Sequence, residues 1–196
     1  MNKLENLIIK YVKNFFIVKD ISGARHKKIA KYAWGKILDL GYAQAPNTFL
    51  RGDVTGLDIN MPQKKPDNYS RILVGDVEHL SEYFINEQFD TIIAGELIEH
   101  LPNYCKFLDE CTKLLRVGGT LIISTPNPYL WYTMLANILF PYGKTNEPAH
   151  LNYQVPRKLN ELLAIRGFSL KKILCGSGLP LMPFTYQLIY IYMKEK

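Results

Sequence analysis

The stretch that decides the fold is FDTIIAGELIEHLPNYCKFLDECTKLLRVGGTLIISTPNP, residues 89–128. Its two ends, residues 89–96 and 119–126, are short apolar runs that are typical of buried strands. Between them, residues 103–117 carry apolar side chains at helical spacing: Tyr104, Phe107, Leu108, Cys111, Leu114 and Leu115. The stretch therefore predicts a strand, a helix and a second strand, which the chain enters through the turn signal Gly118-Gly119.

The same alternation extends in both directions along the chain. A further helix is predicted from Pro156 to its stop at Gly167. Alternating helices and apolar strands predict an α/β fold with a mostly parallel sheet and helices on both of its faces. The remaining strands are predicted at residues 36–41, 53–59, 70–76, 168–175 and 185–194.

Ligands of such sheets bind beyond the carboxyl ends of the strands, so the last residues of each strand are candidate binding residues. Asp58 is the most informative, because it ends the second strand about 20 residues after Asp39, where nucleotide sites use a carboxylate to bind both hydroxyls of a ribose. A turn or N-cap aspartate is the alternative. A nicotinamide site also needs G-x-G-x-x-G after the first strand, and YAQAP follows Gly41 instead, so that class of site is excluded.

From about Ile37 to the C-terminus the chain resembles the class I S-adenosylmethionine-dependent methyltransferases. The pattern F-D-x-I-x-x-x-E-x-I-E-H, then a helix, then L-x-x-G-G-x-L-x-I-S-x-P-N, looks like the fourth and fifth strands of that family. It is most similar to the branch that acts on small molecules, lipids and glycans, as is the later segment EPAHLNYQVPRKLNELLAIRGFSLKKI. The resemblance implies a Rossmann-like seven-stranded sheet with an antiparallel last strand, with S-adenosylmethionine as cofactor and S-adenosylhomocysteine as product.

The resemblance also implies a role for each residue at the strand ends. Asp39 and Gly41 would flank the methionine end of the cofactor, and Asp58 would bind the ribose. Ile59 would touch the adenine, and Asp76 and Val77 would hold the edge of the ring. Glu96 and Leu97 would lie near the reactive centre. The complete predicted cofactor site is Asp39, Gly41, Tyr42, Asp58, Ile59, Asp76, Val77, Glu96 and Leu97.

The opening of this site departs from the family. The family usually has G-x-G-x-G there, and this chain keeps only Gly41, with Ala43 and Ala45 in place of the other two glycines. The distance to Asp58 is also shorter by about four residues, close to one helical turn. Because Pro46 suits a first helical turn, a shortened helix is predicted to begin there and to direct its N–H groups at the cofactor carboxylate. This pattern favours a shortened but functional cofactor site over one that has lost its function.

Methyl transfer mainly requires alignment of the reacting groups, and a general base helps when the acceptor is a hydroxyl. His100 and His150 are the candidate bases, since imidazole titrates near neutral pH. A loop-shaping role is the alternative for His100. His26 and His79 are expected at the surface or in loops, and Glu96 and Glu99 are not expected to converge as an acid/base pair. No metal site is predicted, because Cys105, Cys111 and Cys175 lack metal-ligand spacing and are typical of reduced thiols in a cytosolic protein.

The chain is predicted to be one domain, residues 1–196, with an N-terminal helical preface (1–34) and an acceptor-side insertion (127–155). In the preface an apolar stripe runs from Leu4 to Phe16 beside lysines, which is typical of a helix that packs on the core, covers a pocket or lies on a membrane. The insertion is rich in aromatic residues, which suit helix packing, an apolar or glycan acceptor, or contact with a membrane.

The predicted function is S-adenosylmethionine-dependent methylation, with a hydroxyl of a small-molecule, lipid or glycan acceptor favoured. The alternative is a catalytically degenerate binding or partner protein. The net charge of +6 and pI of about 9.1 fit either a solvated surface or an anionic partner. A nucleic-acid methyltransferase is disfavoured, since no N-P-P-Y-type motif follows the fourth strand. A cytoplasmic location is expected, with peripheral contact at the inner membrane face as an option.

Overall fold

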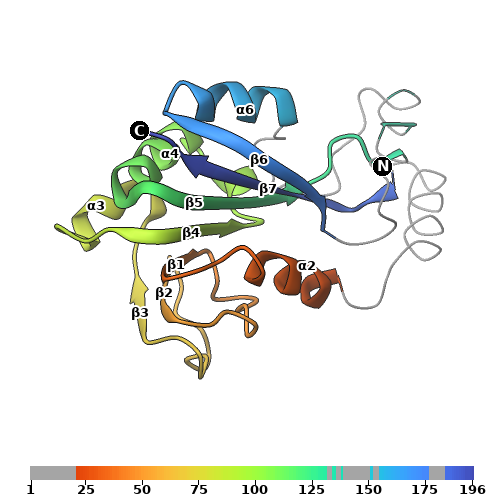
Figure 1. Ribbon diagram of the computed structural model, residues 1–196. Coiled ribbons are helices and arrows are strands. Elements are labelled where there is room, and N and C mark those ends of the chain that lie inside the picture. Colours follow the sequence, from red (N-terminus) through yellow and green to blue (C-terminus); the bar gives the residue numbers. More distant parts are fainter. Residues whose placement is uncertain (1–20, 132–133, 136–137, 139–150, 152–154, 177–183) are drawn as a thin grey trace.

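The structure is a computed structural model that describes residues 21–131, 134–135, 138, 151, 155–176 and 184–196. Its centre is a seven-stranded sheet with strand order β3-β2-β1-β4-β5-β7-β6 (Figure 1). Strand β7 runs antiparallel to both of its neighbours, and the pairs among β1 to β5 are parallel. The predicted mixed sheet is thereby confirmed. The strands are β1 (Lys36–Leu40), β2 (Asp53–Asp58), β3 (Arg71–Val74), β4 (Phe89–Gly95), β5 (Leu115–Pro126), β6 (Phe168–Cys175) and β7 (Gln187–Lys194).

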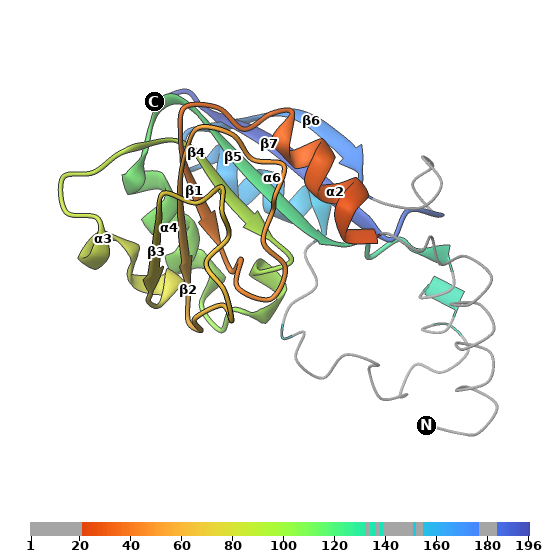
Figure 2. The same cartoon turned by 90° about the horizontal axis from the view of Figure 1, so that it is seen from below.

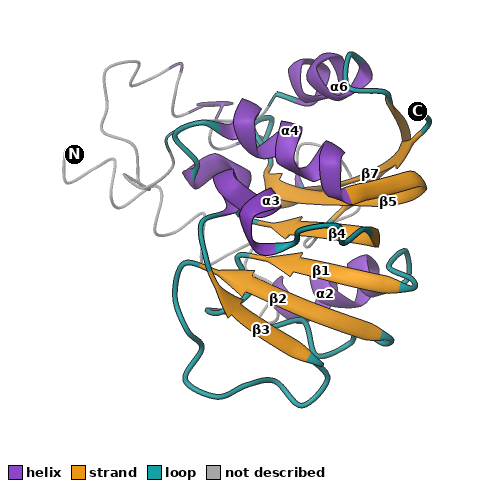
Figure 3. Cartoon of the chain, turned by 90° about the vertical axis from the view of Figure 1, so that its left-hand side faces the viewer, coloured by secondary structure: helices purple, strands orange, loops and turns teal. Residues whose placement is uncertain are grey.

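Helices cover both faces of the sheet, as predicted (Figures 2 and 3). Helix α2 (Ile21–Ala30) lies on one face. The other face carries α3 (Leu80–Tyr83), α4 (Tyr104–Leu114) and α6 (Pro156–Ala164). Two 3-10 turns, η1 (Val77–His79) and η2 (Ile98–His100), follow β3 and β4. No helix among these described residues is long and apolar enough to span a bilayer.

Each face has its own apolar core. The face with three helices buries large side chains from all of them, including Leu80, Phe107 and Leu159. On the face with α2, Ile29 is the buried apolar residue of the helix among residues 23–30, and loops add Tyr42, Leu50 and Tyr69 to the strand residues of this core. Each fully buried side chain of this size stabilises the fold by about 1.5–3 kcal/mol. Helices therefore supply most of the cover on one face of the sheet, and loop side chains supply a large share of it on the other.

Local signals explain the helices on the first of these faces. Helix α4 starts where the Asn103 side chain accepts a hydrogen bond from the Lys106 N–H (3.1 Å). Helix α6 has Pro156 in its first turn, as predicted, and Gly167 follows its end with φ of +82°. Arg166, two residues after α6, forms an ion pair with Asp109 on α4 (2.6 Å) and so connects the two helices.

The predicted helix at Pro46 is wrong, because residues 41–52 form turns and no helix. The Asn47 side chain accepts the Phe49 N–H (3.1 Å) and donates to the His26 carbonyl (3.2 Å). Such side-chain bonds offer the backbone an alternative to a helix. Asn68 adds donations to the Asn47 and Leu50 carbonyls (3.0 and 3.2 Å). These side-chain bonds, several of them from distant residues, take the place of helical hydrogen bonds in this loop.

Parts of the predicted preface and insertion lie outside the described residues. These include the apolar stripe from Leu4 to Phe16 and most of residues 132–154, with His150 among them. The described part of the preface, α2, packs directly on the sheet.

Candidate functional site

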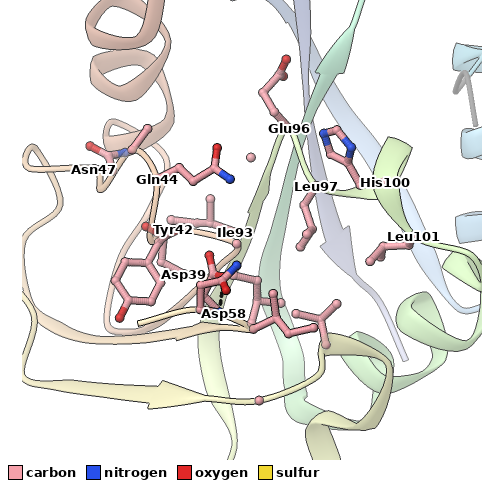
Figure 4. Close-up of a pocket in the computed structure, with 18 of the residues that line it drawn as sticks. Asp39, Tyr42, Gln44, Asn47, Asp58, Ile93, Glu96, Leu97, His100 and Leu101 are labelled. Atoms are coloured by element: carbon pink, nitrogen blue, oxygen red, sulfur yellow. Dashed lines mark hydrogen bonds between the residues drawn. The ribbon is translucent and has the colours of Figure 1, made fainter. Parts of the chain in front are cut away.

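A cavity of about 560 Å³ opens at the carboxyl ends of the central strands (Figure 4). This volume is within the usual range for small-molecule sites. Every residue of the predicted cofactor site lines it, and so does His100. The topology therefore brings these residues together, while their individual roles stay predictions. The lining also includes residues that the sequence did not single out for a role: Arg25, His26, Gln44 and Asn47.

Asp58 is held in a fixed orientation at the end of β2. One carboxylate oxygen accepts the Ala43 N–H and the other accepts the Asn60 N–H, each at 2.9 Å. A carboxylate has about four acceptor positions, so each oxygen keeps capacity for a further donor. The bond to Ala43 also ties the loop after β1 to the end of β2.

Asp39 is buried beside Asp58, and the two lie together in Figure 4. The Tyr69 hydroxyl donates to its carboxylate at 2.5 Å. Burial raises the pKa of Asp39 to about 6, although the Tyr69 hydrogen bond and the charge of Arg25 both lower it. Asp39 therefore changes its charge close to neutral pH.

The loop after β1 is compatible with alanine at two of the family's glycine positions. Gly41 has φ of +68°, and a Cβ there would lie 3.0 Å from Leu97, so glycine is required. Ala43 and Ala45 are not among the described residues with positive φ. Tyr42 packs its ring on Tyr69, with ring centroids 5.0 Å apart.

Glu96 lies at the opposite side of the cavity from Asp39 and Asp58 (Figure 4). Its φ of +54° is unusual for a residue with a side chain, and such strain occurs often at functional sites. The carboxylate is paired with Arg25 (3.4 Å) and accepts a hydrogen bond from Gln187 (3.0 Å). Burial raises the pKa of Glu96, and Arg25 opposes that shift.

Arg25 and His26 are the main residues that the sequence did not identify. Arg25 donates to the Ser124 hydroxyl (3.1 Å), and its guanidinium lies 3.1 Å from the His26 ring nitrogen. The expectation that His26 is a surface or loop residue is wrong, because it is buried on α2 and lines the cavity. No apolar stripe marks the buried face of α2, so the local sequence carried no signal for either residue.

Asp76 and Val77 follow β3 at one side of the cavity. The Asp76 carboxylate caps η1 by accepting the Glu78 N–H (2.9 Å), and its other oxygen lies 3.1 Å from His79. His79 in turn contacts Lys106 and is partly exposed, so its predicted surface location is confirmed. Val77 is buried in the core.

The EH pair after β4 divides between the surface and the interior. His100 is exposed at the cavity, close to Leu97 in Figure 4. Glu99 is buried, and neither carboxylate oxygen has a hydrogen-bond partner among the described residues. Burial, followed by the nearby charge of Glu96, raises the pKa of Glu99 to about 8. The charge of Glu96 thus acts on Glu99, and the expectation that the two carboxylates do not form an acid/base pair stays a prediction.

Comparisons with known proteins agree with this geometry. Residues 21–173 match a family model described as "Methyltransferase domain". A ubiquinone biosynthesis O-methyltransferase of Psychrobacter arcticus is 28% identical over 185 residues, which are 83% of this chain and 69% of that protein. A probable S-adenosylmethionine-dependent methyltransferase of Mycolicibacterium smegmatis is 33% identical over 95 residues, 46% of this chain. The chain spans 34% of the length of that second relative.

Solved structures share the fold at low sequence identity. The CcbJ methyltransferase from Streptomyces caelestis has a TM-score of 0.67 at 14% identity, with 91% of each chain covered. The magnesium protoporphyrin IX methyltransferase from Synechocystis, solved with bound S-adenosylhomocysteine (SAH), has a TM-score of 0.60 at 18% identity, with 90% of this chain and 82% of that chain covered.

Proposed function

The chain belongs to the methyltransferase-domain family, and from this premise we propose that it transfers a methyl group from S-adenosylmethionine to a hydroxyl of a small-molecule, lipid or glycan acceptor. The observation that carries the proposal is the single cavity that collects Asp39, Asp58, Asp76 and Glu96 from four successive strand ends. The name of the Psychrobacter relative supports a hydroxyl as the acceptor group.

The residues of the cavity fit this cofactor. Asp58 retains an acceptor position on each oxygen, which matches the two hydroxyls of a ribose. The methionine carboxylate needs a cation or a set of N–H groups, and the helix that usually supplies them is absent from residues 41–52. Arg25 offers a substitute, because its buried Nε has no hydrogen-bond partner among the described residues. We assign the methionine carboxylate to Arg25 and the ribose to Asp58.

S-adenosylmethionine supplies a methyl group on a positively charged sulfur. The contribution of the chain is to orient the reactants and to accept a proton from the acceptor hydroxyl. Glu96 and Leu97, beside His100, are proposed to line the cofactor near its reactive centre. His100 is the described residue best placed to accept the proton, because it lines the cavity from an exposed position. His150 remains the other proposed base.

A transfer assay tests this proposal. The full chain is incubated with methyl-labelled S-adenosylmethionine and with acceptors that carry a phenolic hydroxyl, a sugar hydroxyl or an amine. Label is expected on a hydroxyl acceptor and is expected to fall sharply in Asp58→Ala. Label only on amines would contradict the hydroxyl assignment. Cofactor binding without transfer to any acceptor would favour the catalytically degenerate partner protein.

We also propose peripheral contact with an anionic membrane surface, which would bring a lipid acceptor near the cavity. Support comes from residues 21–35, 41–52 and 168–176, which contain no Asp or Glu. These segments expose the cations Lys27, Lys31, Arg51 and Lys172. Opposite charges attract at such surfaces.

Vesicle sedimentation tests the membrane proposal. The full chain is expected to sediment with phosphatidylglycerol vesicles and to remain free with phosphatidylcholine vesicles. Reversal of Lys27, Lys31 and Lys172 to Glu is expected to abolish sedimentation. Reversal of the exposed Lys113, Arg157 and Lys158 to Glu, on α4 and α6, is the matched control. Equal sedimentation of both variants would contradict the proposal that the α2 face binds the membrane.

A further inference from the structure

One tyrosine hydroxyl links three separate segments at the cavity. Tyr69 lies just before β3, and its side chain is only 2% exposed. Its hydroxyl donates to Asp39 at the end of β1 (2.5 Å) and accepts the N–H of Asn47 in the loop after β1 (3.2 Å). The Tyr69 ring also stacks on Tyr42 of the same loop.

This link occurs where the loop has no helix to shape it. A helix would satisfy its own backbone groups, and residues 41–52 rely on side chains for that purpose. The neighbouring Asn68 adds two further hydrogen bonds to carbonyls of the loop. Residues 68–69 therefore hold the loop from the side of β3.

We propose that Tyr69 is a positioning residue that orients the Asp39 carboxylate and fixes the 41–52 loop for the methionine end of the cofactor. The inference rests on the proposed function, because it assumes that this end of the cofactor lies at Asp39. The methionine amino group is a cation, and an ionised Asp39 attracts it while a protonated Asp39 does not.

The charged surroundings of Asp39 determine how this effect depends on pH. Arg25 on α2, Asp58 on β2 and Tyr42 in the loop interact with its charge, and His26 on α2 lines the same cavity. Glu96 lines the same cavity from the end of β4. The Tyr69 hydrogen bond lowers the pKa of Asp39, which burial has raised to about 6. Loss of that bond moves the pKa upward, so Asp39 takes up its proton at a higher pH.

The test is Tyr69→Phe, which keeps the ring and removes the hydroxyl. Calorimetric titration with SAH is carried out on the full chain and on the variant from pH 5.5 to pH 8.5. The variant is expected to bind several-fold more weakly at pH 8. The pH at which affinity falls to half is expected to rise by about half a unit or more.

Tyr83→Phe is the matched control. The Tyr83 hydroxyl accepts the Asp76 N–H (3.3 Å) at the end of β3, and Tyr83 is not among the residues that line the cavity with Asp39. Its removal is expected to leave the pH midpoint in place. An unmoved midpoint in Tyr69→Phe would overturn the inference, even if its affinity fell equally at every pH.

Asp39→Asn supplies a second, independent reading if Tyr69→Phe does not fold. It removes the titrating group, so affinity is expected to fall at pH 8 and to lose its decline near pH 6. A parent-like profile in Asp39→Asn would overturn the inference. Failure of the parent chain to bind SAH would instead count against the proposed function, so the two failures are distinct.

Discussion

The two halves of the cavity are built in different ways. Around β1, β2 and β3 the connections after β1 and β2 are loops, and side-chain hydrogen bonds from Asn47, Asp58 and Tyr69 hold them. Around β4 and β5 the connection is α4, which buries Phe107 and Leu108 against the sheet. In the first half, side-chain hydrogen bonds therefore determine the shape of the binding loop, and one of them lowers the pKa of Asp39. In the second half, apolar packing sets stability, and η2 carries the EH pair.

Truncation in the helical half is expected to have the largest effect. Phe107 is fully buried, so Phe107→Ala is expected to lower the free energy of unfolding by about 3–5 kcal/mol. Denaturant titration measures this value. The folded variant is expected to retain its cofactor affinity, because Phe107 does not line the cavity. A loss below about 1 kcal/mol would contradict the assignment of stability to this half.

The raised pKa of Glu99 predicts that the stability of the fold falls as pH rises. The pKa of Glu99 is about 8 in the folded chain against 4.5 as its ordinary value, so the unfolded chain ionises first. Stability is therefore expected to fall by a few kcal/mol as pH rises from about 4.5 to about 8. Glu99→Gln is expected to flatten this decline in melting experiments. An unchanged slope would mean that Glu99 is not the titrating group.

A substitution at Gly56 tests how the 41–52 loop packs on β2. A Cβ at this position would lie 2.6 Å from the Tyr42 ring, so Gly56→Ala is expected to cost about 1–3 kcal/mol of stability. Gly118→Ala is the control, since nothing lies within 4 Å of a Cβ there and only its positive φ is strained. If Gly118→Ala lowered the free energy of unfolding more than Gly56→Ala, the packing of Tyr42 on β2 would not be what fixes the conformation of the loop.

Asp58 tests the binding half directly. Asp58→Ala removes the proposed ribose acceptor and the bonds to Ala43 and Asn60, so cofactor affinity is expected to fall roughly tenfold or more. Calorimetry gives the dissociation constant. Unchanged affinity would disprove the ribose assignment.

The smallest expected effect is at Asn47. Asn47→Ala removes one donated and one accepted hydrogen bond in the loop and is expected to cost about 1 kcal/mol of stability. Thermal melting followed by circular dichroism would detect it. A neutral result would indicate that Tyr69 and Asn68 alone suffice to hold the loop.

The same contrast explains what the sequence could predict. The strands and helices α4 and α6 carry their signals locally, in apolar runs, an N-terminal proline and a stop glycine. The candidate binding residues at the strand ends could be identified because parallel strands end at one edge of a sheet. The error at Pro46 had a different source, since the bonds that replace the helix involve Tyr69, Asn68 and His26, which lie far from the loop in sequence. Arg25 was missed for the same reason, because its partner Ser124 is 99 residues away.

The most direct test of the central claim, that this helix-free loop still forms a working cofactor site, is calorimetric titration of SAH and S-adenosylmethionine into the full chain. The account predicts saturable binding of both compounds at one site, and weaker binding in Asp58→Ala. Absence of binding at millimolar cofactor would contradict it.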